Sequence, residues 1–488
     1  MATLSDQDIE AIARKIVSDL GRAPTGGGGG GGYAAPAAPA PEPGVPSGMG
    51  VFNSVDEAIT AARAAFPVYS ALPLDHRKKI IENIRQTMRE NKTALAKSAH
   101  EETGLGRFED KIVKNELVIE KTPGPEVLHP TAETGDHGLT LTEPAPYGVI
   151  GAITPCTNPT STIINNSIGM LSAGNTVVFN AHPASKRCSM ETIVLVNKAV
   201  TEAGGPPNVV VGVANPSIES AQQLMQHPGI RILVVTGGGG VVKAAMASGK
   251  RAICAGPGNP PVVVDETADM DQAGRDIVLG ASTDNNIICA DEKEVIVVDS
   301  VADALIKSMV HHGAALIDKG KLKALEQVMF TKMAGPRGHA EINRKLIGKN
   351  ADVILSQIGM SVPSTIRLGI VEVDVDHPMM WTEQMMPILP IARVKDADQA
   401  IDLGIEMEGK CYHTAIMHSK HLDRLSRMAR ECNCSIFVKN GRSQAGLGLG
   451  GEGCTSFTIA SPTGEGMTGP VSFSRWRRCT LVDHFRIV

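Results

Sequence analysis

The sequence predicts an α/β protein with two domains, each built on a parallel sheet. Short, fully apolar runs alternate with amphipathic helical stretches, and this pattern is typical of parallel strands that are covered on both faces. In the first region the expected strands are 149–153, 176–179, 209–211 and 231–235, and the helices between them are 160–172, 185–201 and 217–226. A second alternating region runs from 261 to 438, with strands near 262–264, 295–298, 414–417 and 435–438.

The composition is that of a globular protein rather than a membrane bundle. Apolar residues make up 42% of the 488 residues, and no run of about 18 or more apolar residues occurs. The net charge of -5 comes from interspersed acidic and basic residues, so neither nucleic acid nor an anionic membrane is expected as a partner. The nine cysteines are an odd, scattered set, which indicates free thiols in a reducing, cytoplasmic setting.

The first 50 residues are expected to lie apart from the main fold. Within residues 1–20, Ile9, Ile12, Ile16, Val17 and Leu20 share one face of a helix, and acidic and basic residues occupy the rest. Residues 21–50 contain seven consecutive glycines and a run rich in alanine and proline, a composition typical of a linker. The helix is interpreted as a docking element; the alternative is a frayed terminus that packs on its own protein. Its acidic residues argue against a mitochondrial presequence.

The folded body is expected to begin at Val51 and to divide near residue 254. Ser54 and Glu57 have the spacing of a capping box, and a second helix carries Ile80, Ile81, Ile84 and Met88. The expected domains are a nucleotide-binding domain at 51–254, a thiol domain at 255–440 and a return segment at 441–488 that ends in a strand over 480–488.

Loops with unusual sequences follow three of the expected strands. Thr154 to Pro159 follows the strand 149–153, Thr236 and Gly237 to Gly240 follow the strand 231–235, and Ala255 to Pro260 follows Ala252–Cys254. In open parallel sheets ligands bind at the carboxyl ends of strands. A glycine run between a strand and a helix lets backbone N–H groups approach a phosphate, although a simple tight turn is an open alternative.

These motifs, taken together and in order, resemble the aldehyde dehydrogenase superfamily, and within it the coenzyme-A-acylating enzymes of bacterial microcompartments. The resemblance covers 51–488 and implies an aldehyde dehydrogenase-like fold, with two Rossmann-like domains and an oligomerisation strand region. It rests on the loop at 154–159 and 163–170 after it, on 256–261, 284–289, 383–387, 464–470 and 483–488.

The resemblance implies a role for each candidate site residue. Cys289 is the expected nucleophile, and partial exposure beside a positive potential would favour its thiolate. Asn158 and the backbone N–H of Cys289 are the expected oxyanion donors, and Glu383 is expected to hold the nicotinamide ribose. A small buried cysteine and a surface carboxylate are the alternatives for Cys289 and Glu383. The other residues expected to hold NAD are Thr154, Pro155, Thr236, Gly237, Gly238, Gly239, Ala255 and Gly256. No metal is expected.

Two departures from the hydrolytic members of the superfamily are informative. Cys254 occupies the position of the glutamate that activates water, and a thiol is a poor base for that step. Transfer to the thiol of coenzyme A (CoA) needs no such base, so the resemblance implies oxidation of a short-chain aldehyde, propanal or acetaldehyde, to acyl-CoA. Asn180 replaces the lysine that binds the adenine ribose, so the preference for NAD over NADP stays open. A structural role is the alternative for Asn180 and for His182.

The resemblance also implies partners. The segment 123–146 and the terminal strand resemble oligomerisation elements, so a homodimer or homotetramer is expected. Residues 1–20 match the arrangement of encapsulation peptides, which implies docking to a shell protein or another core enzyme in a microcompartment lumen. Three alternatives are open. Cys254 argues against a hydrolytic aldehyde dehydrogenase, and the 257–260 loop argues against an acyl-phosphate reductase. The intact Asn158 and Cys289 pair argues against a catalytically idle shell-associated protein.

Overall fold

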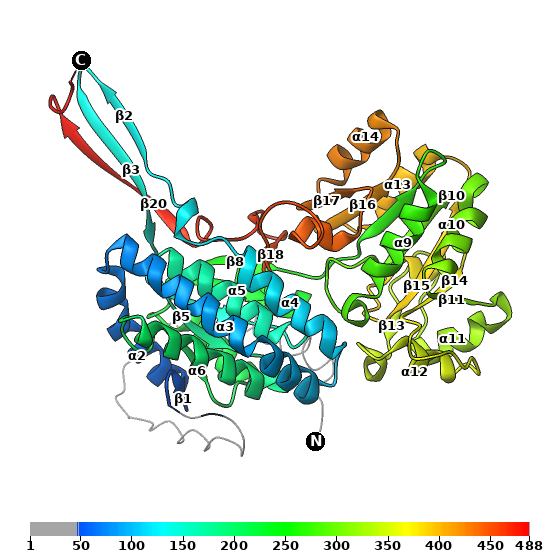
Figure 1. Cartoon of the computed structure of the whole chain (residues 1–488), viewed down its shortest axis with the longest axis horizontal. Coiled ribbons are helices and arrows are strands. Elements are labelled where there is room, and N and C mark those ends of the chain that lie inside the picture. Colours follow the sequence, from blue (N-terminus) through cyan, green and yellow to red (C-terminus); the bar gives the residue numbers. More distant parts are fainter. Residues whose placement is uncertain (1–45, 47, 488) are drawn as a thin grey trace, which may run out of the picture. The chain divides into compact units, whose positions relative to one another are not determined.

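The computed structural model describes residue 46 and residues 48–487, which form two compact units (Figure 1). The first unit contains the described residues up to Leu95, Val118–Gly256 and the residues from Thr468 onward. The second contains Ala96–Leu117 and Pro257–Met467. Each unit is therefore built from separate stretches of the chain. The expected helix at 4–20 and the glycine run lie outside the described residues.

The first unit is built on a six-stranded parallel sheet with the strand order β1-β6-β5-β4-β7-β8. Its strands are β1 (Val51–Phe52), β4 (Val149–Ile153), β5 (Thr176–Asn180), β6 (Val210–Val213), β7 (Ile232–Thr236) and β8 (Arg251–Ala255). The helices between them are α2 (Val55–Ser70), α5 (Pro159–Ser172), α6 (Lys186–Glu202), α7 (Ile218–Gln226) and α8 (Gly239–Met246). The expected alternation of strands and helices is confirmed, because β4, β5, β6 and β7 begin and end within two residues of the expected bounds.

Burial on both faces explains why these strands are continuous apolar runs. Every residue of β4, β5 and β6 is buried, and α2 packs against β5 and β6. The expected capping box is confirmed at the start of α2. The Ser54 hydroxyl accepts from Glu57 N–H at 3.3 Å, and the Glu57 carboxylate accepts from Ser54 N–H at 3.2 Å.

The second unit is built on a seven-stranded parallel sheet with the order β11-β14-β15-β10-β9-β16-β17. Its strands are β9 (Pro261–Val264), β10 (Glu294–Val298), β11 (Ala314–Ile317), β14 (Leu368–Glu372), β15 (Ile388–Val394), β16 (Thr414–His418) and β17 (Ile436–Lys439). Its longer helices are α9 (Met270–Ala281), α10 (Asp299–His311), α11 (Leu322–Met329), α12 (Ala351–Ser356), α13 (Ala397–Met407) and α14 (Leu422–Cys432). Two small hairpins pair β12 (Phe330–Lys332) with β13 (Glu341–Ile342) and β18 (Ile459–Ala460) with β19 (Gly466–Met467).

The sequence reasoning missed β11, β14 and β15 in this sheet. Gly369 lies within β14 and Pro390 within β15, and both residue types are depleted in strands. Their neighbours nevertheless make the apolar interior of the sheet, where β14 and β15 pair over four residues. Tertiary packing therefore overrides the local sequence signal here.

Two long helices and a separate antiparallel sheet complete the described chain. The helices are α3 (Leu74–Thr103) and α4 (Phe108–Lys121), and the sheet consists of β2 (Thr131–Gly135), β3 (Gly138–Pro146) and β20 (Ser474–Val482) in the order β2-β3-β20 (Figure 1). The expectation of a terminal strand at 480–488 is wrong in its bounds. β20 pairs with β3 from Pro146 to Gly138, so it begins at Ser474 and ends where its partner begins. Within the described residues, no helix is long and apolar enough to cross a membrane.

Candidate active site

The first unit gathers its candidate nucleotide-binding residues at the carboxyl ends of three neighbouring strands. β4, β7 and β8 are adjacent in the sheet, and Thr236 pairs with Ala255. Thr154 N–H donates to the carbonyl of Asn180 at 3.3 Å, and Gly237 N–H donates to the carbonyl of Ala255 at 3.1 Å. The first bond ties the loop after β4 to the end of β5, and the second joins the loops after β7 and β8. Because β4 pairs with β7, the loops after β4, β7 and β8 leave neighbouring strands at one edge of the sheet, as expected for a ligand site.

The glycine run opens the N-terminus of α8 to a ligand. Gly238 is the N-cap and Gly239 the first helical residue, and no side chain caps the helix. A β-carbon built on either glycine would meet no atom within 4 Å. Uncapped N–H groups at a helix start favour an anion such as a pyrophosphate. Among the described residues the buried hydroxyl of Thr154 has no hydrogen-bond partner. A polar group of a bound dinucleotide could supply that partner, so this edge of the sheet fits such a ligand.

Asn158 lies at the start of α5, whose residues are all buried. It is the N-cap, followed by Pro159, yet its side chain makes no capping bond to the helix. Its Nδ2 lies 3.3 Å from the hydroxyl of Thr157, and the residue is 8% exposed. An N-cap asparagine normally accepts from a helical N–H group. The Asn158 side chain therefore does not serve as the cap of α5.

The departures Asn180, His182 and Cys254 all have packing or hydrogen-bonding explanations in the first unit. The side-chain Oδ1 of Asn180 accepts from the hydroxyl of Ser220 at 2.6 Å, and His182 Nδ1 accepts from Ala184 N–H at 3.1 Å. Cys254 is fully buried in an apolar cluster that includes Val235. A thiol in that setting does not activate water.

Cys289 lies in the second unit, on a turn that leads into β10. The thiol is partly buried. Burial, together with the carboxylates of Glu383 and Asp291, raises its pKa to about 12, and the ammonium of Lys293 opposes this rise. The expected partial exposure is present and Lys293 supplies a positive charge, but the expected environment that favours the thiolate is not found, because burial and the two carboxylates outweigh the one ammonium.

Glu383 and Gly258 lie beside Cys289. The Glu383 carboxylate accepts from Gly258 N–H, and burial raises its pKa while Lys293 lowers it. A β-carbon on Gly258 would lie 2.8 Å from the carbonyl oxygen of Cys289 and 2.9 Å from Cγ of His413. Only glycine therefore allows this close approach. Of the expected residues, the structure brings Cys289 and Glu383 together in this unit, while the others lie in the first.

His413 is a candidate functional residue that the sequence reasoning missed. It is fully buried immediately before β16, its Nδ1 lies 2.8 Å from the hydroxyl of Thr414, and its Nε2 has no hydrogen-bond partner among the described residues. Burial lowers its pKa to about 4, and the charge of Lys293 adds to this effect. No motif singled out this histidine. The signal in the sequence was its place directly before the expected strand 414–417.

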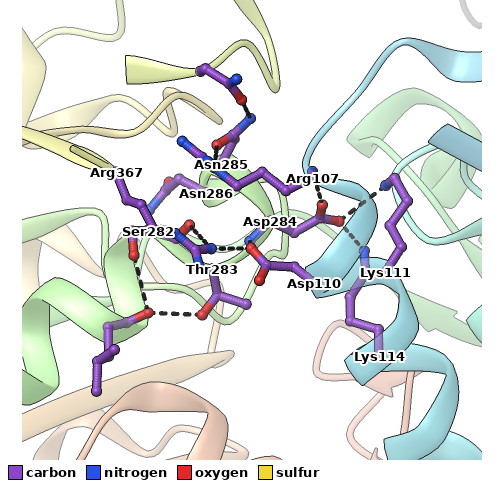
Figure 2. A network of polar contacts seen from close by, with 12 residues as sticks. Arg107, Asp110, Lys111, Lys114, Ser282, Thr283, Asp284, Asn285, Asn286 and Arg367 are labelled. Carbon is purple, nitrogen blue, oxygen red and sulfur yellow. Dashed lines mark hydrogen bonds and ion pairs between the residues drawn. The ribbon is translucent and has the colours of Figure 1, made fainter. Parts of the chain in front are cut away.

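A network of buried polar groups holds the segment before Cys289 (Figure 2). Asp284, Asn285 and Asn286 all have positive φ, at 45°, 57° and 65°. The Asp284 carboxylate accepts from Arg107 N–H at 2.6 Å, from Lys111 at 3.1 Å and from Lys114. Although burial alone would raise the pKa of Asp284, the two lysines outweigh it and hold that pKa below its ordinary value. Three successive left-handed residues are strained, so the ion pairs keep the chain in a conformation that it would otherwise leave.

Comparison with known proteins shows the family of the chain. A model of the aldehyde dehydrogenase family matches residues 50–457. The acetylating acetaldehyde dehydrogenase EutE of Salmonella typhimurium is 50% identical over 441 residues, which cover 90% of this chain and 94% of the relative.

Two solved structures extend the likeness to the fold. A propionaldehyde dehydrogenase from the fucose utilisation bacterial microcompartment of Clostridium phytofermentans is 46% identical, with a TM-score of 0.87 over 90% of this chain and 100% of that one. The propionaldehyde dehydrogenase of Rhodopseudomonas palustris, solved with bound CoA and an acylated cysteine, is 47% identical, with a TM-score of 0.86 over 90% and 99%. The chain belongs to the aldehyde dehydrogenase family.

Proposed function

We propose that this protein oxidises a short-chain aldehyde, propanal or acetaldehyde, to its acyl-CoA thioester with reduction of NAD. The observation that carries the proposal is Cys289, a partly buried thiol on a turn braced by buried charges and beside Glu383. A relative with 50% sequence identity is named as an acetylating acetaldehyde dehydrogenase. Another, with 47% identity, is a propionaldehyde dehydrogenase solved with bound CoA and an acylated cysteine. They support the same chemistry at this thiol.

Cys289 is the proposed nucleophile. Its thiolate adds to the aldehyde carbon, so that a carbon–sulfur bond forms and the carbonyl π electrons move to oxygen. The side-chain amide of Asn158 and the backbone N–H of Cys289 are the proposed donors to this oxygen, because donors placed in advance stabilise a developing charge. After loss of hydride the acyl group remains on Cys289 as a thioester.

The first unit is proposed to hold the dinucleotide. When bound there, NAD would supply the acceptor for the hydride that leaves the tetrahedral carbon as the thioester forms. The residues proposed to bind it are Thr154, Pro155, Thr236, Gly237, Gly238, Gly239, Ala255 and Gly256, with Glu383 for the nicotinamide ribose. The uncapped helix start at Gly238 and the unpartnered hydroxyl of Thr154 support this assignment.

The acyl group is proposed to pass to CoA rather than to water. The thiolate of CoA forms the new carbon–sulfur bond, and the Cys289 thiolate leaves. A thiol loses its proton far more readily than water does, so this transfer needs no strong base. Cys254, the residue at the position of the water-activating glutamate, is buried among apolar side chains, which disfavours hydrolysis to a free acid.

The test separates the two half-reactions. With aldehyde and NAD but without CoA, we expect a burst of NADH near one equivalent per site and then slow turnover. CoA should restore fast turnover and give acyl-CoA as the main product, and Cys289→Ser serves as the control that should give no burst. Fast steady-state NADH formation without CoA, with free acid accumulating, would contradict the proposal and favour a hydrolytic enzyme.

Residues 1–20 are proposed to dock the enzyme to a microcompartment shell protein or another core enzyme. The support is the apolar stripe of Ile9, Ile12, Ile16, Val17 and Leu20 before a linker, because helix-in-groove recognition uses anchors at i, i+3, i+4 and i+7. The C. phytofermentans neighbour belongs to such a compartment. Fluorescent protein fused to residues 1–20 should gather with shells, and Ile12→Asp with Ile16→Asp should leave it diffuse. Diffuse signal from the unaltered fusion would refute the docking role.

The antiparallel sheet β2-β3-β20 is proposed to join subunits in a homodimer or homotetramer. Trp476, Leu481 and Val482 on β20 are 54%, 41% and 61% exposed. Exposed apolar side chains on an edge strand favour pairing with another chain. Trp476→Glu with Leu481→Glu should lower the mass measured by light scattering. An unchanged mass would exclude this surface.

A further inference from the structure

Lys293 is a buried lysine whose ammonium makes three hydrogen bonds to the segment before Cys289. The residue is 2% exposed and follows Cys289 by four positions. Its Nζ lies 2.8 Å from the Asn286 carbonyl oxygen, 2.7 Å from Asn286 Oδ1 and 3.1 Å from the Ile288 carbonyl oxygen. An ammonium has three donors, and all three are used on residues 286 and 288.

These bonds close the turn that carries Cys289. The Asn286 side chain donates to the carbonyls of Ala281 and Glu292, each at 2.8 Å. Lys293 N–H donates to the Pro260 carbonyl at 3.0 Å, which joins this turn to the loop that contains Gly258. Loss of the ammonium would remove the donor to Asn286 Oδ1, a donor to the Asn286 carbonyl and one of the two donors to the Ile288 carbonyl, which also accepts from Asp291 N–H at 3.1 Å. The backbone that carries Cys289 would therefore loosen.

The same ammonium lies near every candidate functional group of the second unit. Burial has the largest influence on the pKa values of Cys289, Glu383 and His413: it raises the first two and lowers the third. The charge of Lys293 lowers all three. The acids Asp291, Glu292 and Glu294 also face it. The ionisable groups with the main influence on the Cys289 sulfur are thus the acids Glu383 and Asp291, whose own pKa values are raised by burial, and the ammonium of Lys293.

We propose that Lys293 is a positioning residue that fixes the turn of Cys289 and stabilises negative charge on its sulfur. The proposal rests on the proposed function for the importance of that charge, because the sulfur is anionic both when it attacks the aldehyde and when it leaves to CoA. The ammonium is bonded at 3.1 Å to the carbonyl of Ile288, the residue before Cys289, and a nearby opposite charge favours the ionised form of a group. Water does not screen a buried pair as it screens a surface pair.

Lys114 provides a matched control from the same network. It is also a buried lysine that holds the segment before Cys289, but its ammonium pairs with the Asp284 carboxylate (Figure 2). Its charge is not among the main influences on the pKa of Cys289. Lys114→Met therefore loosens the segment without removing the charge that faces the thiol.

The test measures thiolate formation without substrate, NAD or CoA. Alkylation of Cys289 by iodoacetamide is followed by mass spectrometry of its peptide between pH 6 and 9, and the logarithm of the rate is plotted against pH. The thiolate is the reacting species. Lys293→Met and Lys293→Gln should shift the plot along the pH axis to higher pH by at least about one unit. At a given pH the alkylation would then be roughly tenfold slower. Lys293→Arg and Lys114→Met should stay within about 0.3 unit of the wild type.

The outcomes separate charge from packing. Lys293→Gln keeps an N–H donor for the carbonyls, so it decides the question if Lys293→Met fails to fold. A plot for Lys293→Gln that coincides with the wild type would overturn the proposal, as would an equal displacement in Lys114→Met. The alkylation test contains no substrate, so its result does not depend on the proposed function. If the enzyme forms free acid without CoA while the Lys293 variants still displace the plot, the proposed function is refuted and the role of Lys293 stands.

Discussion

The two units treat buried polarity in opposite ways. In the described part of the first unit, the buried polar side chains are asparagine, serine and threonine, and Arg77 is the one buried charge. The second unit buries many charges: Lys111, Lys114, Asp265, Asp276, Asp284, Asp291, Glu292, Lys293, Glu294 and Glu408. Neutral amides and hydroxyls suit a site where backbone N–H groups meet a phosphate, whereas a thiolate needs charges arranged around it.

The units also use opposite ends of their sheets. The first presents its candidate residues at the carboxyl ends of β4, β7 and β8. The second presents Gly258, Cys289 and His413 just before β9, β10 and β16, at the amino ends of three neighbouring strands. The rule that ligands lie at carboxyl ends therefore describes the proposed nucleotide side and not the thiol side. The predictions below test whether charge in the second unit and neutral donors in the first perform the roles proposed for them.

The largest effect is expected from the thiol itself. Cys289→Ser should lower kcat for aldehyde oxidation by several orders of magnitude, because a hydroxyl is hardly ionised near neutral pH. Because the two side chains are nearly equal in volume, the unfolding midpoint and NAD binding, measured by titration, should change little. Substantial turnover by the Ser variant would remove Cys289 from the nucleophile role.

The second effect compares a buried charge with a buried amide. Asp284→Asn removes the partner of two buried lysines and should lower the free energy of unfolding by about 3–5 kcal/mol. Asn175→Ala in the first unit removes an amide that accepts from Tyr147 N–H at 2.7 Å and Gly148 N–H at 3.1 Å, and should lower it by about 1–3 kcal/mol.

Urea unfolding of both variants measures the difference, and hydrogen exchange of the peptide over 282–288 shows where it arises. Exchange there should rise in Asp284→Asn and stay unchanged in Asn175→Ala. If Asp284→Asn costs no more than Asn175→Ala, the buried charges do not hold this segment.

How much of this was available from the sequence differs between the two units. Fully apolar strands alternating with helices predicted the first sheet closely, because burial on both faces leaves a strong local signal. The buried charges of the second unit left none. Lys111 and Lys114 lie on α4, about 170 residues before Asp284, and their spacing resembles that of an ordinary exposed helix face. Only tertiary packing makes them partners.

The candidate site shows the same limit. Cys289 and Asn158 came from motifs matched in order, but the pKa of Cys289 depends on Glu383, which lies 94 positions later. Lys293, four residues from Cys289, reads in sequence as one charge within a solvated turn, Asp291-Glu292-Lys293-Glu294. The structure buries all four side chains. A charged run predicts an exposed surface on average, and the exception occurs where charge is needed inside.

The third effect tests the neutral donors of the first unit. Asn158→Ala should lower kcat by about 10²–10³, the usual consequence of removing one oxyanion donor, with the KM for NAD unchanged. Asn165→Ala is the matched control on α5, where that amide donates to the Thr122 hydroxyl at 2.9 Å; it should lower stability and leave kcat near the wild-type value. Equal losses of kcat in both variants would indicate a disturbed helix rather than a lost donor.

The smallest effect is a dependence of stability on pH that arises from Glu292. Burial raises its pKa to about 7, although Ser443 N–H and the Ser443 hydroxyl donate to it at 2.7 and 2.8 Å. A carboxyl whose folded pKa exceeds the unfolded value binds its proton more tightly when folded. Its contribution to stability is therefore complete below about pH 4.5 and is lost as the pH rises through 7. The raised pKa values of Asp291 and Glu294 act in the same direction.

Glu292→Gln should therefore flatten the decline in unfolding free energy between pH 5 and 8 by about 1–3 kcal/mol. The variant should be more stable than the wild type at pH 8, because its neutral amide carries no charge to bury and can still accept from Ser443 N–H. Urea unfolding across this pH range measures the slope, and Glu109→Gln, on the exposed face of α4, should reproduce the wild-type curve. A Glu292→Gln curve parallel to the wild type would show that the pKa of this carboxyl is the same in the folded and unfolded states. The charge of Lys293 would then offset the effect of burial on the pKa of Glu292 completely.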